Sequence, residues 1–173
     1  LAVGWFLLAP KDYEELGRSV RYQVTFVSNI LFMRQDGYFD VASDLKPLLH
    51  TWSLAVEEQF YIFFPLLLTL LSSRLKHWRL ALFAVLLVSF GLSVWAINQH
   101  PEKAFCLLPM RAWELLAGAI RAIAPKRAWG LRPWGARVLG LLGMGWFLLA
   151  VFVYDKSTPF PGATALLPVL GVV

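Results

Sequence analysis

The stretch LALFAVLLVSFGLSVWAI, at residues 80–97, runs for 18 positions without a charged side chain. Because a helix needs about 20 mostly apolar residues to cross the hydrocarbon core of a bilayer, this stretch predicts a transmembrane helix. In the whole sequence of 173 residues, 58% of the residues are apolar and only 16% are charged, which is too little charge to cover a soluble domain. The sequence therefore predicts an all-α fold, part of a polytopic bundle of transmembrane helices.

Apolar segments recur on both sides of this stretch. Residues 138–154 are uncharged for 17 positions, and the other segments are shorter or hold a few charges. In chain order, the segments expected in the membrane are residues 1–9, 16–33, 54–71, 80–97, 104–120, 138–154 and 158–173. This gives about seven membrane segments in one domain over residues 1–173, and we expect the first and last segments to be truncated.

The distribution of basic residues predicts the orientation of these segments. The net charge is +5, and positive side chains of membrane proteins gather in cytoplasmic links, so we expect no nucleic-acid partner. Two links between the segments are rich in basic residues. The first contains Arg74, Lys76, His77 and Arg79, and the second contains Arg121, Lys126, Arg127, Arg132 and Arg137. With both in the cytoplasm, alternation places the links at residues 34–46, 100–103 and 155–156 outside; the first of these holds Asp36, Asp40 and Asp44.

Two features bear on cross-links and packing. Cys106 is the single cysteine, which excludes an internal disulfide, and no Cys and His group has the spacing of a metal site, so we expect no bound metal. Small residues four positions apart, Gly118 with Ala122 and Ala136 with Gly140, are typical of helices that approach closely.

A polar cluster begins the segment at residues 54–71. Ser53, Glu57 and Tyr61 are spaced four apart and share one helix face, and His50 precedes them. Glu57 and Glu58 would suit the positive end of the helix dipole, which is one interpretation. A polar pocket is the other interpretation, because such a set of side chains is costly when it faces lipid.

A second cluster lies at residues 111–118. Arg111 and Glu114 are three apart and can pair along their own helix. Alternatively, Arg111 can pair with Glu57 or Glu58 from a neighbouring helix. A third, smaller polar feature is Ser28 with Asn29, for which helix–helix hydrogen bonding is the simplest interpretation.

These residues resemble a known family. Residues 48–61, LLHTWSLAVEEQFY, resemble the signature of the acyltransferase 3 family of integral membrane proteins. Residues 111–118, RAWELLAG, resemble the second familiar stretch of that family, in the expected order. Ser28 and Asn29, followed by residues 38–40, YFD, match the pattern that leads into the first signature. The resemblance covers roughly residues 1 to 123.

The resemblance implies a multi-pass enzyme of the bacterial inner membrane. Members transfer acyl groups, often acetyl from acetyl-CoA, to hydroxyls of cell-envelope glycans such as lipopolysaccharide O-antigen, peptidoglycan or exopolysaccharide. The expected partners are the lipid bilayer, the glycan acceptor and acyl-CoA as donor substrate, with no tightly bound cofactor. The usual catalytic histidine of the family lies in a first membrane helix that precedes these residues, so we expect this chain to be inactive by itself.

The resemblance and the chemistry of O-acyl transfer together assign roles to the two clusters. A carboxylate orients the catalytic histidine or holds the acceptor hydroxyl, and a cation steadies the developing negative charge. The catalytic candidates are Glu57, Glu58, His50 and Arg111. The substrate-binding candidates are Ser53, Trp52, Tyr61, Glu114 and Asn29. A membrane transporter or flippase of an envelope precursor is the alternative, because charges at mid-membrane depth also mark transport paths. A purely structural membrane subunit is a third possibility.

Overall fold

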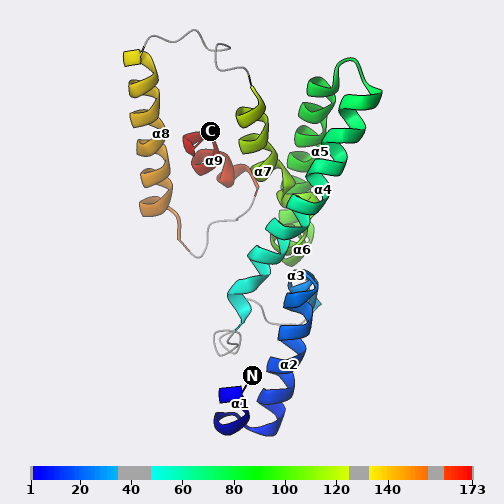
Figure 1. Ribbon diagram of the computed structural model, residues 1–173. Coiled ribbons are helices and arrows are strands. Elements are labelled where there is room, and N and C mark those ends of the chain that lie inside the picture. Colours follow the sequence, from blue (N-terminus) through cyan, green and yellow to red (C-terminus); the bar gives the residue numbers. More distant parts are fainter. Residues whose placement is uncertain (1, 35–47, 125–132, 156–161, 173) are drawn as a thin grey trace. The chain divides into compact units, whose positions relative to one another are not determined.

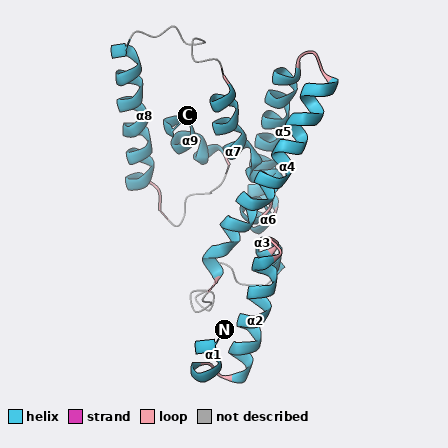
Figure 2. Cartoon of the chain, in the orientation of Figure 1, coloured by secondary structure: helices cyan, strands magenta, loops and turns pink. Residues whose placement is uncertain are grey.

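The computed structural model describes residues 2–34, 48–124, 133–155 and 162–172. These residues form helices and connecting turns, and no strand is found among them (Figures 1 and 2). The predicted all-α fold is confirmed. The acidic link at residues 34–46, apart from Arg34, lies outside the described residues, as do residues 38–40, Lys126, Arg127, Arg132 and Lys156.

Within the described ranges, three of the expected membrane segments are helices long and apolar enough to cross a bilayer. They are α4 (Trp52–Arg74), extended at its start by the 3-10 turn η2 (Leu49–Thr51), then α5 (Trp78–Gln99) and α8 (Pro133–Val153). Most large apolar side chains of α8 are exposed. Lipid is the medium that makes such exposure favourable, because apolar surface in water would cost free energy.

The described chain divides into two compact units. The first contains Leu1–Leu66 with Cys106–Leu108, and the second contains Leu67–Phe105 with Pro109–Val173. The first unit begins with α1 (Ala2–Leu7), α2 (Pro10–Val24) and α3 (Ser28–Arg34). Helix α1 lies against α2, where the rings of Trp5 and Tyr13 meet edge to face at 5.4 Å. The buried residues of this unit come from α3, η2 and the start of α4, together with Cys106.

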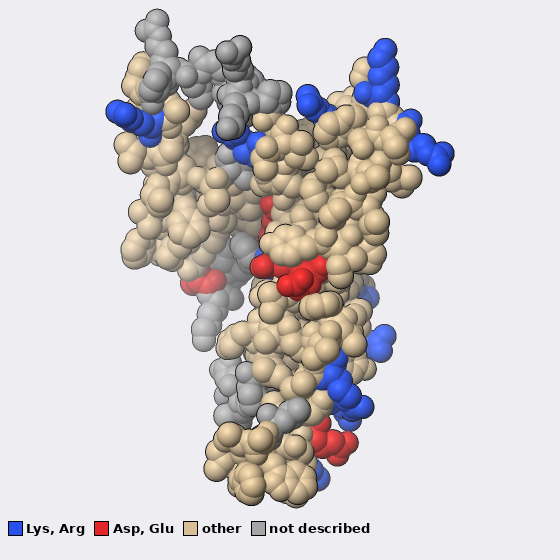
Figure 3. All heavy atoms as spheres, in the orientation of Figure 1, with Lys and Arg blue, Asp and Glu red and all other residues tan. Residues whose placement is uncertain are grey.

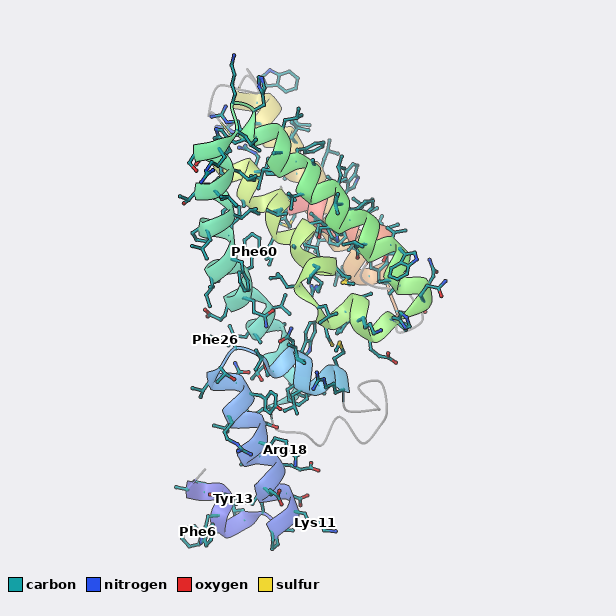
Figure 4. The ribbon with its side chains drawn as sticks, turned by 90° about the vertical axis from the view of Figure 1, so that its right-hand side faces the viewer. Phe6, Lys11, Tyr13, Arg18, Phe26 and Phe60 are labelled. Atoms are coloured by element: carbon teal, nitrogen blue, oxygen red, sulfur yellow. The ribbon has the colours of Figure 1, made fainter. Side chains whose placement is uncertain are left out.

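Residues 16–33, expected as one membrane segment, do not form one continuous helix. The chain leaves the helical conformation after Val24 and resumes it at Ser28. The amide of Phe26 donates to the Gln23 carbonyl at 3.0 Å, and that of Val27 donates to the Tyr22 carbonyl at 2.9 Å. With Phe26 at a φ of 57°, this is a Schellman C-cap in which phenylalanine occupies the position that glycine usually takes. Phe26 lies where the ribbon turns from α2 into α3 (Figure 4).

The second unit begins with the last part of α4, from Leu67 to Arg74, and a tight turn joins it to α5 in an antiparallel hairpin (Figure 1). Lysine and arginine side chains gather at the tip of this hairpin (Figure 3), where Arg74, Lys76 and Arg79 are exposed. The basic link of the sequence is thus a short turn of concentrated positive charge.

The expected single segment at residues 104–120 is divided in the structure. Helix α6 (Pro101–Cys106) ends before Leu107, and α7 (Leu108–Ile123) has 16 residues. Pro109 sits in the first turn of α7, where its missing N–H costs nothing because that group would have no intrahelical partner. The chain then passes through α8 and the turn η3 (Ala163–Ala165) to α9 (Leu166–Val172).

Close helix approach occurs at a different place from the expected one. A Cβ atom added at Gly118 or Gly140 would meet nothing within 4 Å. Instead, α8 and α9 cross where Gly143 faces Gly171, and a Cβ added to Gly143 would overlap the Gly171 carbonyl oxygen. Among the described residues, no helix therefore approaches Gly118 or Gly140 closely.

Candidate active site

The polar feature on α3 is joined to the signature helix α4 in the first unit. Asn29 is 1% exposed, and both ends of its amide are used. Its Nδ2 donates to the Cys106 carbonyl oxygen at 3.0 Å, and its Oδ1 accepts from Gln59 Nε2 at 3.0 Å. Gln59 Nε2 also donates to the Phe26 carbonyl oxygen at 2.7 Å. One glutamine of the signature thus connects Asn29 to the break after α2.

Ser28 makes a similar connection to the chain just before α4. Its side chain is fully buried. The hydroxyl donates to Gln23 Oε1 at 2.8 Å and lies 3.3 Å from the Thr51 carbonyl oxygen. Helix–helix hydrogen bonding, the simplest interpretation of Ser28 and Asn29, is therefore observed. That Asn29 also binds substrate stays a prediction.

The carboxylates of the signature do not sit at the end of their helix. Helix α4 begins at Trp52 and has no acidic residue in its first turn, so Glu57 and Glu58 lie one turn further along. The helix dipole acts mainly on the first turn, so it does not explain acidic residues at these two positions. Glu57 is exposed and Glu58 is half-buried, and among the described residues neither forms an ion pair.

The other predicted residues of this cluster differ in exposure. Tyr61 is 60% exposed and lies on the same face as Glu57, one turn away. His50 is exposed on η2, and its carbonyl oxygen accepts from the Ser53 hydroxyl at 3.3 Å. Trp52 is 6% exposed and belongs to the core of the unit. The structure therefore groups Glu57 and Tyr61 on an open face, while Trp52 packs inward.

The first unit also has an open hollow of about 370 Å³. It is lined by Arg18, Arg21, Tyr22, Thr25 and Leu31. None of the predicted site residues lines this hollow, and no group of His, Cys, Asp and Glu in the described ranges is arranged to hold a metal ion.

In the second unit, Arg111 and Glu114 form an ion pair along α7. The Arg111 Nη2 and Glu114 Oε2 atoms are 2.7 Å apart, and the two side chains are 19% and 14% exposed. The guanidinium also lies over the Phe105 ring, 5.8 Å from its centre. The pairing of these residues along their own helix is confirmed. The alternative pairing of Arg111 with Glu57 or Glu58 stays a prediction.

Sequence reasoning did not single out Ser89, which holds the first turn of α7. The Ser89 hydroxyl accepts from the Trp113 amide at 2.9 Å and donates to the Pro109 carbonyl oxygen at 2.6 Å. The signal in the sequence was the spacing of Ser89 and Ser93, two serines four apart in an otherwise apolar span. Such a pair lies on one helix face and predicts a contact with a neighbouring helix.

The chain was also compared with known proteins. A family described as an acyltransferase domain matches residues 5–172. A Haemophilus influenzae protein named "Uncharacterized protein" is 30% identical over 168 residues, which make up 91% of this chain and 69% of that protein. A Komagataeibacter xylinus protein named "Putative membrane-bound transacylase BcsY" is 29% identical over 172 residues, 96% of this chain and 44% of that protein.

A shorter match involves Staphylococcus aureus. A protein named "Putative O-acetyltransferase" is 38% identical over 105 residues, which make up 57% of this chain and 17% of that protein. The chain thus spans less than half of the Komagataeibacter and Staphylococcus relatives. No solved structure matches the chain. Because the family match extends over nearly all 173 residues, well beyond the two quoted motifs, this chain belongs to the acyltransferase 3 family of membrane proteins.

Proposed function

We propose that the full-length protein transfers an acyl group, most simply acetyl, from acyl-CoA to a hydroxyl of a cell-envelope glycan at the bacterial inner membrane. The observation that carries this proposal is the pair of carboxylates, Glu57 and Glu58, on a spanning helix away from its end and without an ion pair in the described structure. Carboxylates at membrane depth are costly, and they are usually retained for function.

The names of two relatives support the transfer of an acyl group to an oxygen atom. The Staphylococcus protein is named for O-acetyl transfer, and the Komagataeibacter protein is named as a membrane-bound transacylase. An oxygen acceptor in a membrane enzyme fits a hydroxyl of a surface polysaccharide. These names belong to longer proteins, so we apply them to the full-length protein.

The proposed reaction replaces a thioester by an oxygen ester. The acceptor oxygen attacks the thioester carbon, the C–O bond forms as the C–S bond breaks, and the hydroxyl proton passes through a general base to the leaving thiolate. Two demands follow: the hydroxyl must be held against its base, and negative charge on the carbonyl oxygen must be stabilised. We propose that Glu57 or Glu58 meets the first demand and Arg111 the second.

The surrounding residues would then bind the acceptor or shape the pocket. Tyr61 shares the exposed face of Glu57, which suits a sugar, because aromatic rings pack on sugar faces and the phenol can hydrogen bond. His50 and Ser53 would shape the start of this face, and Glu114 would hold the Arg111 guanidinium in place. Trp52 is buried, so its contribution would be to support the start of α4.

The proposal is tested by the esters of the envelope. The full-length gene is expressed in a host that lacks its own copy, and ester-linked acetyl is measured on purified envelope polysaccharide. Wild type is compared with Glu58→Ala, Arg111→Ala and the control Glu14→Ala, which alters an exposed acid of α2. Acetyl that is present with wild type and Glu14→Ala, and lost with the other two at equal membrane levels, supports the proposal. Envelope esters of every kind unchanged by wild type would contradict it and favour transport.

A further inference from the structure

The Ser89 hydroxyl joins two backbone groups that are four residues apart in α7. In a regular helix the Trp113 amide pairs with the Pro109 carbonyl oxygen. The Ser89 hydroxyl, from α5, also accepts from that amide at 2.9 Å and donates to that carbonyl at 2.6 Å. Both hydrogen-bonding functions of the hydroxyl are satisfied, and its residue is 5% exposed. Ser89 is therefore fastened to the first turn of α7 from outside the helix.

The next serine on the same face of α5 does not form this pair of hydrogen bonds. Ser93 lies one turn along α5 and is fully buried, yet its hydroxyl has no hydrogen-bond partner within the described residues. A buried hydroxyl without a partner costs free energy, whereas one with a donor and an acceptor contributes to stability. The two serines are therefore both buried, but only the Ser89 hydroxyl forms hydrogen bonds to α7.

The turn of α7 that Ser89 holds belongs to the second motif, residues 111–118. Arg111 lies between Pro109 and Trp113 in the sequence, and Glu114 follows directly. The Trp113 ring also meets the Phe90 ring of α5 edge to face at 5.0 Å. Two adjacent residues of α5, Ser89 and Phe90, thus fix the backbone and one side chain of this turn. The direction in which α7 presents the Arg111–Glu114 ion pair depends on that backbone.

We propose that Ser89 is a positioning residue for Arg111. It acts through the backbone of α7: by clamping Pro109 and Trp113, it sets where the guanidinium lies when negative charge develops on the acyl carbonyl oxygen. This inference rests on the proposed function for the role of Arg111. The clamp itself is a property of the fold and can be measured without any activity. Misplacement of a catalytic group by about 1 Å can cost about 100-fold in rate, so a clamp of this kind matters for turnover.

The test uses the full-length protein, purified in lipid nanodiscs, in four forms: wild type, Ser89→Ala, Ser89→Thr and Ser93→Ala. Ser89→Thr keeps the hydroxyl, and Ser93→Ala removes an equally buried hydroxyl that clamps nothing. Amide hydrogen exchange is followed by mass spectrometry in the peptide around residues 109–116. Acyl transfer kinetics are measured in parallel with acetyl-CoA as donor.

We expect faster exchange at residues 109–116 in Ser89→Ala only, together with a kcat that falls about tenfold or more at a nearly unchanged KM for acetyl-CoA. Ser89→Thr and Ser93→Ala should resemble wild type in both measurements. Unchanged or slower exchange in Ser89→Ala overturns the clamp, and faster exchange with unchanged kcat overturns the positioning role. If wild type transfers no acetyl, the proposed function fails, and the exchange result still decides whether Ser89 clamps α7.

Discussion

Asn29 is a buried amide that connects three segments of the first unit. Through its two polar atoms it reaches the Cys106 carbonyl and the Gln59 side chain, and Gln59 continues to the Phe26 carbonyl. A buried polar network is stable when each member has its partners, and removing one member leaves the others unsatisfied. The hydrogen bonds of Asn29 therefore account for an amide at a position where an apolar side chain would be usual.

Asn29→Ala should lower the free energy of unfolding by about 1–3 kcal/mol, since it removes this partner from the half-buried Gln59 amide and from the buried Cys106 carbonyl. The matched control is Asn98→Ala, because Asn98 is exposed and its amide donates only to the Val94 carbonyl of its own helix. The measurement is thermal unfolding of the purified full-length protein in detergent. Equal midpoints for the two variants would contradict the network.

Two ion pairs of the chain provide a second comparison at this scale. Arg111 and Glu114 are 2.7 Å apart and mostly buried, whereas Arg18 and Glu14 are 3.9 Å apart with side chains 49% and 76% exposed. Glu114→Ala removes the carboxylate from a poorly solvated guanidinium and should cost about 3 kcal/mol of stability, at the lower end of the range for buried pairs. Glu14→Ala should cost at most about 1 kcal/mol, as exposed pairs do. Similar losses in chemical denaturation would show that Arg111 is well solvated.

At the scale of helices, hydrophobic length predicted the three long spans, whereas the breaks within residues 16–33 and 104–120 were not predicted. The spans of α4, α5 and α8 follow from apolar runs near bilayer thickness, and the structure agrees with them. The break at Phe26 was not predictable, because its left-handed conformation is one that phenylalanine rarely adopts and its sequence carries no glycine or proline. The division at Leu107 lies just before Pro109 in the first turn of α7, and the nearby Cys106 carbonyl accepts from Asn29.

The sequence also predicted only part of the candidate site. The motifs identified the helices that carry Glu57, Glu58 and Arg111, because those side chains are chemically conspicuous in apolar segments. Gln59 and Ser89 were missed as organising residues, since an amide or a hydroxyl in a span reveals its role only through its partners. Sequence spacing places residues on one face of a helix, but it does not say which helix lies opposite.

The crossing of α8 and α9 gives a prediction at the scale of elements. A Cβ at Gly143 would overlap the Gly171 carbonyl oxygen, and a Cβ at Gly171 would lie 2.6 Å from the Gly143 carbonyl oxygen. Gly143→Ala should therefore destabilise the packing of α9 by about 1–3 kcal/mol, as overpacking does. Gly145→Ala is the control on the same helix, because nothing lies within 4 Å of its added Cβ. Thermal unfolding of the full-length protein in detergent is the measurement, and equal midpoints for the two variants would refute the crossing.

The charged links predict the orientation of the whole molecule in the membrane. The turn between α4 and α5 carries Arg74, Lys76 and Arg79, and these residues should stay in the cytoplasm. Helix α5 then spans the membrane, so the exposed Glu102 at the start of α6 should lie outside.

This orientation predicts the access of a membrane-impermeant maleimide. In a Cys106→Ala background, which removes the buried native cysteine, Glu102→Cys should be labelled in intact spheroplasts. Lys76→Cys should be labelled only after the membrane is permeabilised. The reverse pattern would invert the topology and place Glu57 and Tyr61 at the cytoplasmic side.

The most direct test of the central claim, acyl transfer that depends on the motif residues, is a reconstitution. Full-length protein in vesicles is given acetyl-CoA labelled in the acetyl group, together with envelope glycan, and the label recovered on the glycan as an alkali-labile ester is counted. Wild type and Glu14→Ala should transfer label at equal rates, and Glu58→Gln and Arg111→Ala should each lose about 100-fold or more, the effect typical of a group that positions or stabilises the transition state. Equal transfer by all four proteins would contradict the assignment of Glu58 and Arg111 to the reaction.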